Sequence, residues 1–394
     1  MNKMMCYTLF AILAATAVDT TNANAAPEKV FSLDASGIQL AADSYGERVY
    51  IPDQKNNALS IVNANSLLLE TTLPLNDTPV DIALDEAAGI AYISLQNTPE
   101  LLILDLVSRE LTGSIALPQP AHELVVGNAY IYATPVTSGN DIMRISKAIQ
   151  AYVDDFSGGV FVYYRGALEL TPNKDRLVFA NRGLSPGTLA VFDISASEPQ
   201  LLIKNAHGAL GSNGQNISVD PINGDFVSYA VGGGNGSGYT IAKLDITDFT
   251  WQGEFDIGAY PRAVHHSLDG FSTYTNNTAN QIKVWDNTNF SLQNTFVVSG
   301  NPKDFADLRD STHLAVLGDQ EFAIYRVKDE QPAPTVKIEG RITGSELYRV
   351  VCTNNTTGQR VKYNTSGQFF DCISAGLSAT KGDAVRMTLY SNVE

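Results

Sequence analysis

Two adjacent histidines, His265 and His266, follow Arg262 in the segment "PRAVHHSLDG" and are the first residues whose type suggests chemistry. Imidazole groups bind transition metals and transfer protons near neutral pH, and the 394-residue chain contains only five of them. A metal or acid–base site needs both rings to face the same space. Whether they do depends on the secondary structure that holds them.

The surrounding sequence is a repeat. Residues 261–300 contain four short apolar segments separated by turns rich in Asp, Asn and Gly, and residues 79–118 and 37–76 follow the same scheme. Equivalent first-strand positions recur every 41 to 49 residues, at Gly37, Pro79, Pro120, Arg165, Gly214, Pro261 and Pro302. A period of about 40–50 residues with four strands per unit is typical of a β-propeller. We therefore predict an all-β fold with a seven-bladed β-propeller over residues 26–327.

Three units of the repeat are irregular. The seventh unit supplies only three strands, and we expect "KVFSL", residues 29–33, to pair with it as the fourth, because closing the ring removes an exposed sheet edge. In the third unit we expect the apparent insertion "VTSGNDIMRISKAIQAYVDDFSG", residues 136–158, to contain a short helix. The fifth unit has a Gly-rich loop, "VGGGNGSG".

The repeat resembles the YVTN-type (WD40-like) family of β-propellers. The matching segments are "PRAVHHSLDG…STYTNN…IKVWDNTNF…NTFVVSG", "PVDIALDEAAGIAYISLQ…LLILDLVSRELTGSIAL" and "LTPNKDRLVFAN…LAVFDIS". The resemblance spans residues 29–327 and implies the propeller fold. It implies little about function, because members of the family include surface proteins, periplasmic binding proteins and enzyme subunits.

The histidines can be interpreted within this fold. His265 and His266 occupy consecutive positions of one strand, and neighbouring strand residues point to opposite faces. The two rings therefore cannot chelate one metal, and we expect each to pack or to donate hydrogen bonds between blades. We expect the same packing role for Trp251 and Trp285, although a carbohydrate platform is an alternative for a propeller tryptophan.

A candidate site lies where the innermost strands begin, since these positions converge on the mouth of the central channel. Alignment of the units places Gln39, Asp81, His122, Ala167, Asn216, Ala263 and Asp304 in one ring. Three of these residues, Asn216, Ala263 and Asp304, directly follow a polar residue, which is Gln215, Arg262 and Lys303 respectively. Convergent polar groups in a concavity are the default hypothesis for a ligand site. The predicted ligand-binding residues are Asp81, His122, Gln215, Asn216, Arg262, Lys303 and Asp304, and the ligand is a small polar molecule or a cation.

An enzyme is the alternative. Lactonase-like propellers hold a metal with carboxylate and amide groups, which Asp81, Asn216 and Asp304 could imitate, and lyase-like propellers pair a histidine with an acid, as His122 with Glu123 could. Adjacent strand residues diverge, however, so we expect Glu123 not to face His122. The sequence contains no G-x-S-x-G, Walker, H-E-x-x-H or haem-attachment motif. We predict no catalytic residue, no metal ligand and no cofactor.

The N-terminus and the net charge bear on location and partners. Lys3, an apolar run and the small residues "ANA" at 23–25 are typical of a signal peptide, which we place at residues 1–25. The net charge of −16 and the pI of about 4.7 disfavour nucleic acid and membrane surfaces as partners. We therefore predict a periplasmic or extracellular bacterial protein without membrane insertion.

The C-terminal part differs from the repeat. "KDEQPAPT", residues 328–335, is typical of a linker, and residues 336–394 contain five strand-like segments that predict a small Ig-like or transthyretin-like β-sandwich. Cys352 and Cys372 are the two cysteines left after signal removal, and we expect them to form a disulfide. The function that these features favour is an exported, non-catalytic binding or scaffold protein that engages a protein, an envelope component or a small polar ligand.

Overall fold

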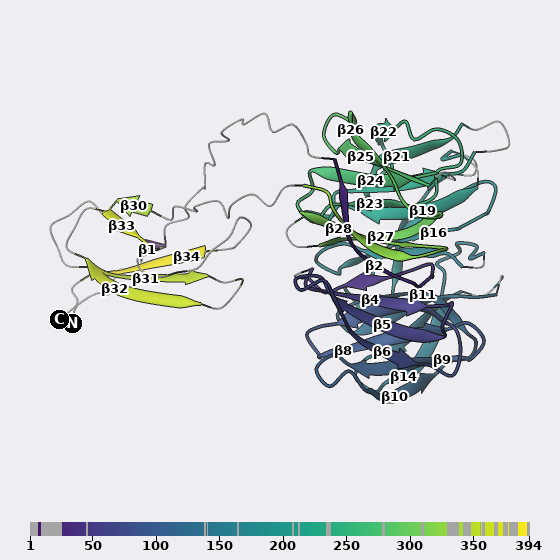
Figure 1. Ribbon diagram of the computed structural model, residues 1–394, viewed down its shortest axis with the longest axis horizontal. Helices are drawn as coiled ribbons and strands as arrows, with labels where there is room; N and C mark the ends of the chain where they lie inside the picture. Colours follow the sequence, from purple (N-terminus) through teal and green to yellow (C-terminus); the bar gives the residue numbers. More distant parts are fainter. Residues whose placement is uncertain are drawn as a thin grey trace. The chain divides into compact units, whose positions relative to one another are not determined.

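The fold is seen in a computed structural model (Figure 1). Every regular element among the described residues is a β-strand, and none of those residues belongs to a helix with the length and apolar character that crossing a membrane requires. The described residues are 7–8, 26–44, 46–137, 139, 141–163, 165–206, 209–211, 213–233, 238–277, 280–308, 311–328, 339–341, 348–354, 356, 359–365, 369–372, 377 and 385–391.

Seven four-stranded antiparallel sheets form the blades of a β-propeller, as the period of the sequence predicts. The strands of blades one to three are β3 Ala41–Ala42, β4 Arg48–Asp53, β5 Ala58–Asn63, β6 Leu68–Pro74; β7 Pro79–Asp85, β8 Ile90–Leu95, β9 Glu100–Asp105, β10 Leu111–Ala116; β11 Ala121–Val126, β12 Tyr130–Pro135, β13 Ile142–Ser146 and β14 Ala151–Phe156. Those of blades four and five are β15 Ala167–Leu170, β16 Arg176–Ala180, β17 Leu189–Asp193, β18 Gln200–Lys204; β19 Gly214–Val219, β20 Phe226–Val231, β21 Thr240–Asp245 and β22 Trp251–Phe255. Those of blades six and seven are β23 Val264–His266, β24 Ser272–Asn276, β25 Gln281–Asp286, β26 Leu292–Val297; β27 Pro302–Leu308, β28 His313–Gly318, β29 Phe322–Arg326 and β2 Glu28–Leu33.

The position of a strand within its blade follows from its polarity. The first strand of a blade, such as β7, is almost wholly buried, whereas the fourth strand, such as β10, is mostly exposed. Neighbouring first strands contact one another around the whole ring, so they line the central channel. Four second strands each bury a tyrosine completely, at Tyr92, Tyr132, Tyr229 and Tyr274. The four rings belong to the apolar clusters of the blades, so burial of their apolar surface helps to hold the blades together.

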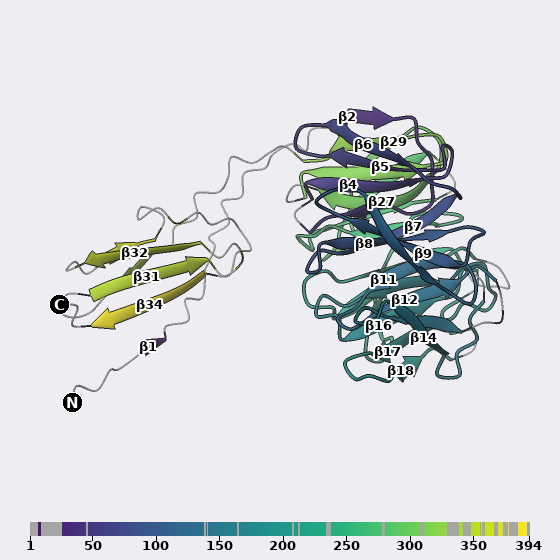
Figure 2. The ribbon, with the colours of Figure 1, turned by 90° about the horizontal axis from the view of Figure 1, so that it is seen from below.

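The N-terminal strand closes the ring, which confirms the prediction for residues 29–33. Strand β2 pairs antiparallel with β29, and Figure 2 shows the purple N-terminal strand beside the green strand of blade seven. Phe31 packs edge-to-face on Phe322, with ring centroids 6.2 Å apart. The last blade therefore combines the two ends of the propeller sequence, which removes the free edge that a three-stranded blade would leave.

The predicted short helix in residues 136–158 is wrong. This segment supplies β13 and β14, the third and fourth strands of blade three. Ile142, Met143 and Ile145 are all fully buried, and a short run buried on both faces does not distinguish a helix from a strand by periodicity alone. Arg144 within the run pairs with Asp154 on β14, with its Nε 2.7 Å from Oδ1, so its charge is compensated inside the sheet.

The chain divides into two units, residues 24–329 and residues 1–23 with 330–394. The second unit contains a sheet of β1 (Tyr7–Thr8), β34 (Val385–Ser391), β31 (Tyr348–Asn354) and β32 (Arg360–Thr365), in that order, and a pair of β30 (Glu339–Arg341) and β33 (Phe369–Asp371). Cys352 and Cys372 form the expected disulfide. The Ig-like or transthyretin-like sandwich stays a prediction. Of the predicted signal peptide, only residues 7–8 are among the described residues, and most of the linker 328–335 also lies outside them.

Candidate binding site at the channel mouth

A pocket of about 290 Å³ lies where the first strands of the blades begin. Five predicted site residues line it: His122, Gln215, Asn216, Arg262 and Lys303. They come from blades three, five, six and seven, so segments far apart in the sequence meet at one point. The other lining residues are Ile38, Arg165, Arg182, Gly183 and Pro302. We call this set of ten residues the mouth pocket.

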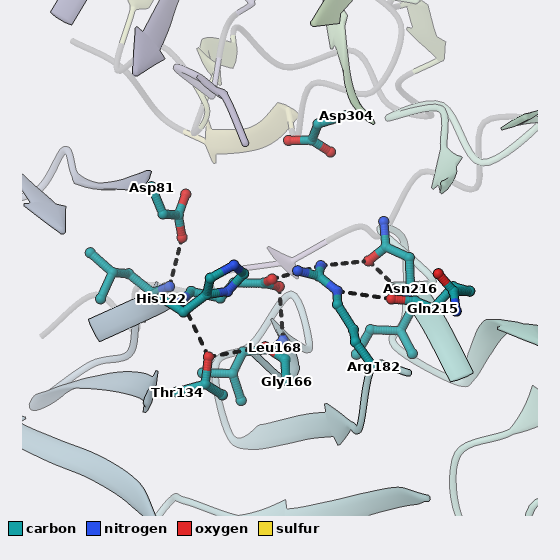
Figure 3. Close-up of polar contacts among 12 residues, drawn as sticks. Asp81, His122, Thr134, Gly166, Leu168, Arg182, Gln215, Asn216 and Asp304 are labelled. Carbon is teal, nitrogen blue, oxygen red and sulfur yellow. Dashed lines mark hydrogen bonds and ion pairs between the residues drawn. The ribbon is translucent and has the colours of Figure 1, made fainter. Parts of the chain in front are cut away.

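Arg182 is the most firmly held side chain of the mouth pocket. It comes from the loop between β16 and β17 and forms an ion pair with Glu123, with Nη2 2.7 Å from Oε2. Its Nε donates to the carbonyl oxygen of Gln215 at 2.8 Å, and its Nη2 donates to Asn216 Oδ1 at 3.2 Å (Figure 3). These contacts join blades three, four and five and fix the guanidinium in place.

The amides beside Arg182 are also ordered. Asn216 Oδ1 accepts from Arg182 and from the backbone N–H of Ile217 at 3.0 Å, so the Asn216 Nδ2 group is left as a donor. Gln215 Nε2 donates to Asn213 Oδ1 at 2.8 Å. The mouth pocket therefore offers amide and cationic donors in fixed orientations, which is the arrangement that binds a polar ligand with low entropic cost.

His122 is uncharged. The residue is 4% exposed, and its Nδ1 has no hydrogen-bond partner among the described residues. Burial, followed by the charges of Arg182 and Arg165, lowers the pKa of His122 well below its usual range. The ring is therefore a neutral donor or acceptor at neutral pH. Burial and the charge of Arg262 also lower the pKa of Lys303, although Asp319 acts in the opposite sense.

The remaining predicted residues, Asp81 and Asp304, do not line the mouth pocket. Asp81 is buried, and its Oδ2 accepts the backbone N–H of Leu124 in the next blade at 2.6 Å (Figure 3). Asp304 Oδ2 accepts the backbone N–H of Leu40 at 2.9 Å, which joins blade seven to blade one. Both carboxylates thus hold neighbouring blades together.

Two further acids have the same role. Glu123 Oε1 accepts the N–H of Leu168 at 2.8 Å, and Glu169 Oε2 accepts the N–H of Val219 at 2.6 Å. We call Asp81, Glu123, Glu169 and Asp304 the carboxylate ring. Burial raises the pKa of all four groups, to about 7 for Asp304, and the Glu123 charge adds to the shift at Asp81. Because each acid bonds to the backbone of the next blade, the carboxylate ring is structural.

The structure corrects the alignment of blade three. Asp81 N donates to Ser94 Oγ at 3.1 Å, and the equivalent contact in blade three is made by Glu123 N to Thr134 Oγ1 at 3.2 Å. The counterpart of Asp81 is therefore Glu123 and not His122. The first strands β7, β11, β19 and β27 each begin with a register irregularity, and a bulge of this kind re-aims the side chains beside it.

Sequence reasoning missed Arg165 and Arg182 as pocket residues. Arg165 occupies the repeat position where the other blades have Pro or Gly, so its deviation from the pattern was a usable signal. Arg182 gave no such signal, because it lies in a loop between the second and third strands and not on the periodic first strand.

The adjacent histidines lie away from this pocket. His266 Nδ1 bonds to Thr273 Oγ1 at 2.9 Å, its backbone N–H donates to Ser218 of blade five, and its ring meets Phe226 edge-on. Burial lowers the pKa of His265 to about 4 and that of His266 to about 3. The inter-blade packing role is confirmed for His266.

The two tryptophans behave differently. Trp285 is buried against Phe255 of blade five, with ring centroids 5.9 Å apart, and its Nε1 donates to Thr275 Oγ1 at 2.7 Å. Trp251, by contrast, is 51% exposed, so the expectation that it packs between blades is wrong. It lies on a fourth strand, where the outer edge of a blade faces solvent.

A metal site of the lactonase-like type finds no support in this geometry. Asp81 and Asp304 are engaged with backbone N–H groups of neighbouring blades, and they lie outside the pocket that Asn216 lines. Throughout the described ranges, no cluster of three or more His, Cys, Asp or Glu residues has the spacing that holds a metal ion.

Comparison with known proteins supports the fold class. No family model and no curated protein matches this sequence. Among solved structures, Kuenenia stuttgartiensis hydrazine synthase matches with a TM-score of 0.58 and 12% identity, covering 78% of this chain and 96% of that chain. At such identity the likeness shows a shared fold alone. The protein is a seven-bladed β-propeller, and its relation to the YVTN type stays a resemblance in sequence.

Proposed function

We propose that this protein is an exported, non-catalytic β-propeller that binds a small polar ligand at the mouth of its central channel. The observation that supports this best is the convergence of His122, Asn216, Arg262 and Lys303 from four blades on one pocket. The pocket is concave, most of its lining side chains are polar or charged, and it lies where the first strands of the blades begin. These are the features of a ligand site.

Binding is better supported than catalysis. General acid–base chemistry needs a proton-transfer group within about 3 Å of the reacting atom. The carboxyl group beside the mouth pocket, Glu123, is held by Arg182 and by the N–H of Leu168. Among the residues that the structure describes, no Asp or Glu lines the pocket, so this geometry does not supply the acidic partner that the hydrolase or lyase alternative requires.

Export and a macromolecular partner belong to the same proposal. The Cys352–Cys372 disulfide is consistent with an oxidising compartment. The second unit would attach the propeller to a protein or an envelope component, while the mouth pocket holds the small molecule. N-terminal sequencing of protein purified from a bacterial periplasm should begin at Ala26, and a chain retained with Met1 in the cytoplasm would contradict export.

A thermal-shift screen tests the binding function. The panel should contain neutral sugars, amino acids, polyamines, organic acids and phosphate esters. We expect at least one class to raise the melting temperature of the native protein and to lose this effect in Asn216→Ala. If no class stabilises the protein, or if the stabilisation persists when mouth-pocket residues are replaced, the proposed function is wrong.

A further inference from the structure

We infer that the mouth pocket binds a small organic anion that has two or more carboxylate or phosphate groups. This inference rests on the proposed function and names its ligand class. The sequence suggested a mixed ring that would accept a polar molecule or a cation. In the structure the charges are separated. The acidic side chains of the carboxylate ring accept backbone N–H groups at the blade junctions, and the basic side chains line the mouth pocket.

The charge of the pocket is opposite to that of the protein. The chain has a net charge of −16, yet four cationic side chains, Arg165, Arg182, Arg262 and Lys303, line a single concavity. A cluster of like charges is unfavourable for the folded state, and repulsion from Arg262 contributes to the lowered pKa of Lys303. An arrangement of this kind is stabilised when a ligand of opposite charge occupies it.

Only part of this charge is compensated by the protein. Glu123 pairs with Arg182 at 2.7 Å. Neither Arg262 nor Lys303 forms an ion pair within the described part of the chain. Asp319, whose charge acts on Lys303, is itself held by the backbone N–H and the side-chain amide of Asn301. At least two cations therefore face the pocket without a carboxylate partner.

The neutral groups of the pocket fit the same ligand. Asn216 presents Nδ2 as a donor, since its oxygen already accepts from Arg182 and Ile217. His122 lines the pocket and is buried, and its pKa lies well below the usual range, so its ring adds no positive charge to the cluster. Guanidinium groups bind carboxylate and phosphate oxygens in bidentate fashion, and amide donors complete their coordination.

The position of the cations and the size of the cavity limit the ligand further. Arg182, Arg262 and Lys303 come from blades four, six and seven, so they approach from different sides and favour a ligand with more than one anionic group. A dicarboxylate, a tricarboxylate or a small phosphate monoester fits a cavity of about 290 Å³.

Isothermal titration calorimetry of the full chain tests the inference. The probes are citrate, succinate, glycerol 3-phosphate and inorganic phosphate, with sorbitol as the neutral comparison, each at low and at high ionic strength. We expect saturable binding of citrate or glycerol 3-phosphate that weakens with added salt, and none of sorbitol. Preference between those two probes decides whether the carboxylate or the phosphate chemistry is the native one.

Matched variants locate the site. Arg262→Gln and Lys303→Gln should each weaken anion binding by about ten- to a hundredfold, as expected for loss of a charge-assisted hydrogen bond. Lys29→Gln and Arg326→Gln remove the same charges on β2 and β29, where each cation pairs with a glutamate, and should leave affinity unchanged. A cooperative melting transition in each of the four variants, as in the native protein, would show that each is folded.

The failures are distinguishable. Binding of sorbitol or another neutral ligand that depends on Asn216 but not on Arg262 or Lys303 would overturn the inference and leave the proposed function standing. Anion binding that is equally weakened by Lys29→Gln would show a non-specific electrostatic effect and would also overturn it. If no probe binds in calorimetry and no compound raises the melting temperature in the thermal-shift screen, both the anion inference and the proposed binding function are wrong.

Discussion

The carboxylate ring and the mouth pocket lie close together at the start of the innermost strands, yet their charged groups have different roles. In the carboxylate ring, each acid accepts a backbone N–H from the next blade, for example Asp81 from Leu124 at 2.6 Å. In the mouth pocket, Arg262 and Lys303 face a cavity of about 290 Å³. The difference shows that chemical type alone does not identify a binding residue; its hydrogen-bond partners do.

The first prediction concerns the stability of the propeller at neutral pH. Asp81→Ala removes the acceptor for Leu124 N–H inside the junction of blades two and three. We expect the free energy of unfolding to fall by about 1–3 kcal/mol, the usual cost of an unsatisfied buried donor. Urea denaturation followed by tryptophan fluorescence measures this loss. Asp81→Asn keeps one acceptor oxygen and should lose less, and equal losses in the two variants would contradict the structural role.

A second prediction concerns the pH dependence of stability. Burial raises the pKa of Asp304 from 3.8 to about 7, so between these values the folded state holds a proton that the unfolded state releases. The contribution of Asp304 to stability is therefore present at low pH and is lost as pH rises from about 4 to 7. Asp304→Asn lacks this dependence.

The measurement is a comparison of unfolding curves at several pH values. Relative to the native protein, Asp304→Asn should gain stability as pH rises from about 4 to 7, by about 1 kcal/mol per pH unit, and the difference should be constant above that range. Lowered pKa values of His265 and His266 produce the opposite slope in both proteins, so they cancel in the difference. A difference independent of pH would show that Asp304 ionises normally.

The smallest predicted effect links the two regions. Glu123→Gln keeps the acceptor for Leu168 N–H but removes the charge that compensates Arg182. If the mouth pocket binds an anion, its affinity should increase about three- to tenfold, which corresponds to about 1 kcal/mol of added attraction. Calorimetry with the best probe measures it. Weaker anion binding in this variant would mean that Glu123 positions Arg182 more than it neutralises it.

The sequence was sufficient to predict the blades but not the chemistry of their mouth. Seven repeats and the closing strand at residues 29–33 follow from period and polarity, which many residues specify together. The helix expected in residues 136–158 failed because a short buried run has no clear period.

Individual site residues depend on register, which a single position can change. One residue of offset in blade three exchanges His122 and Glu123 between the pocket and the blade junction. The bulges at the start of β7, β11, β19 and β27 cause offsets that the repeat alone does not reveal. Arg182 lies in the loop between β16 and β17, outside the periodic first strands, so the repeat did not predict it, although it is the centre of the polar network.

The most direct test of the division between the two regions is the unfolding free energy of the double variant Arg262→Gln/Lys303→Gln. If these cations serve a ligand, their removal should leave stability unchanged or raise it by up to about 1 kcal/mol, since repulsion between them is relieved. A loss as large as that of Asp81→Ala would show that the cations hold the fold together, and the distinction drawn between the mouth pocket and the carboxylate ring would be wrong.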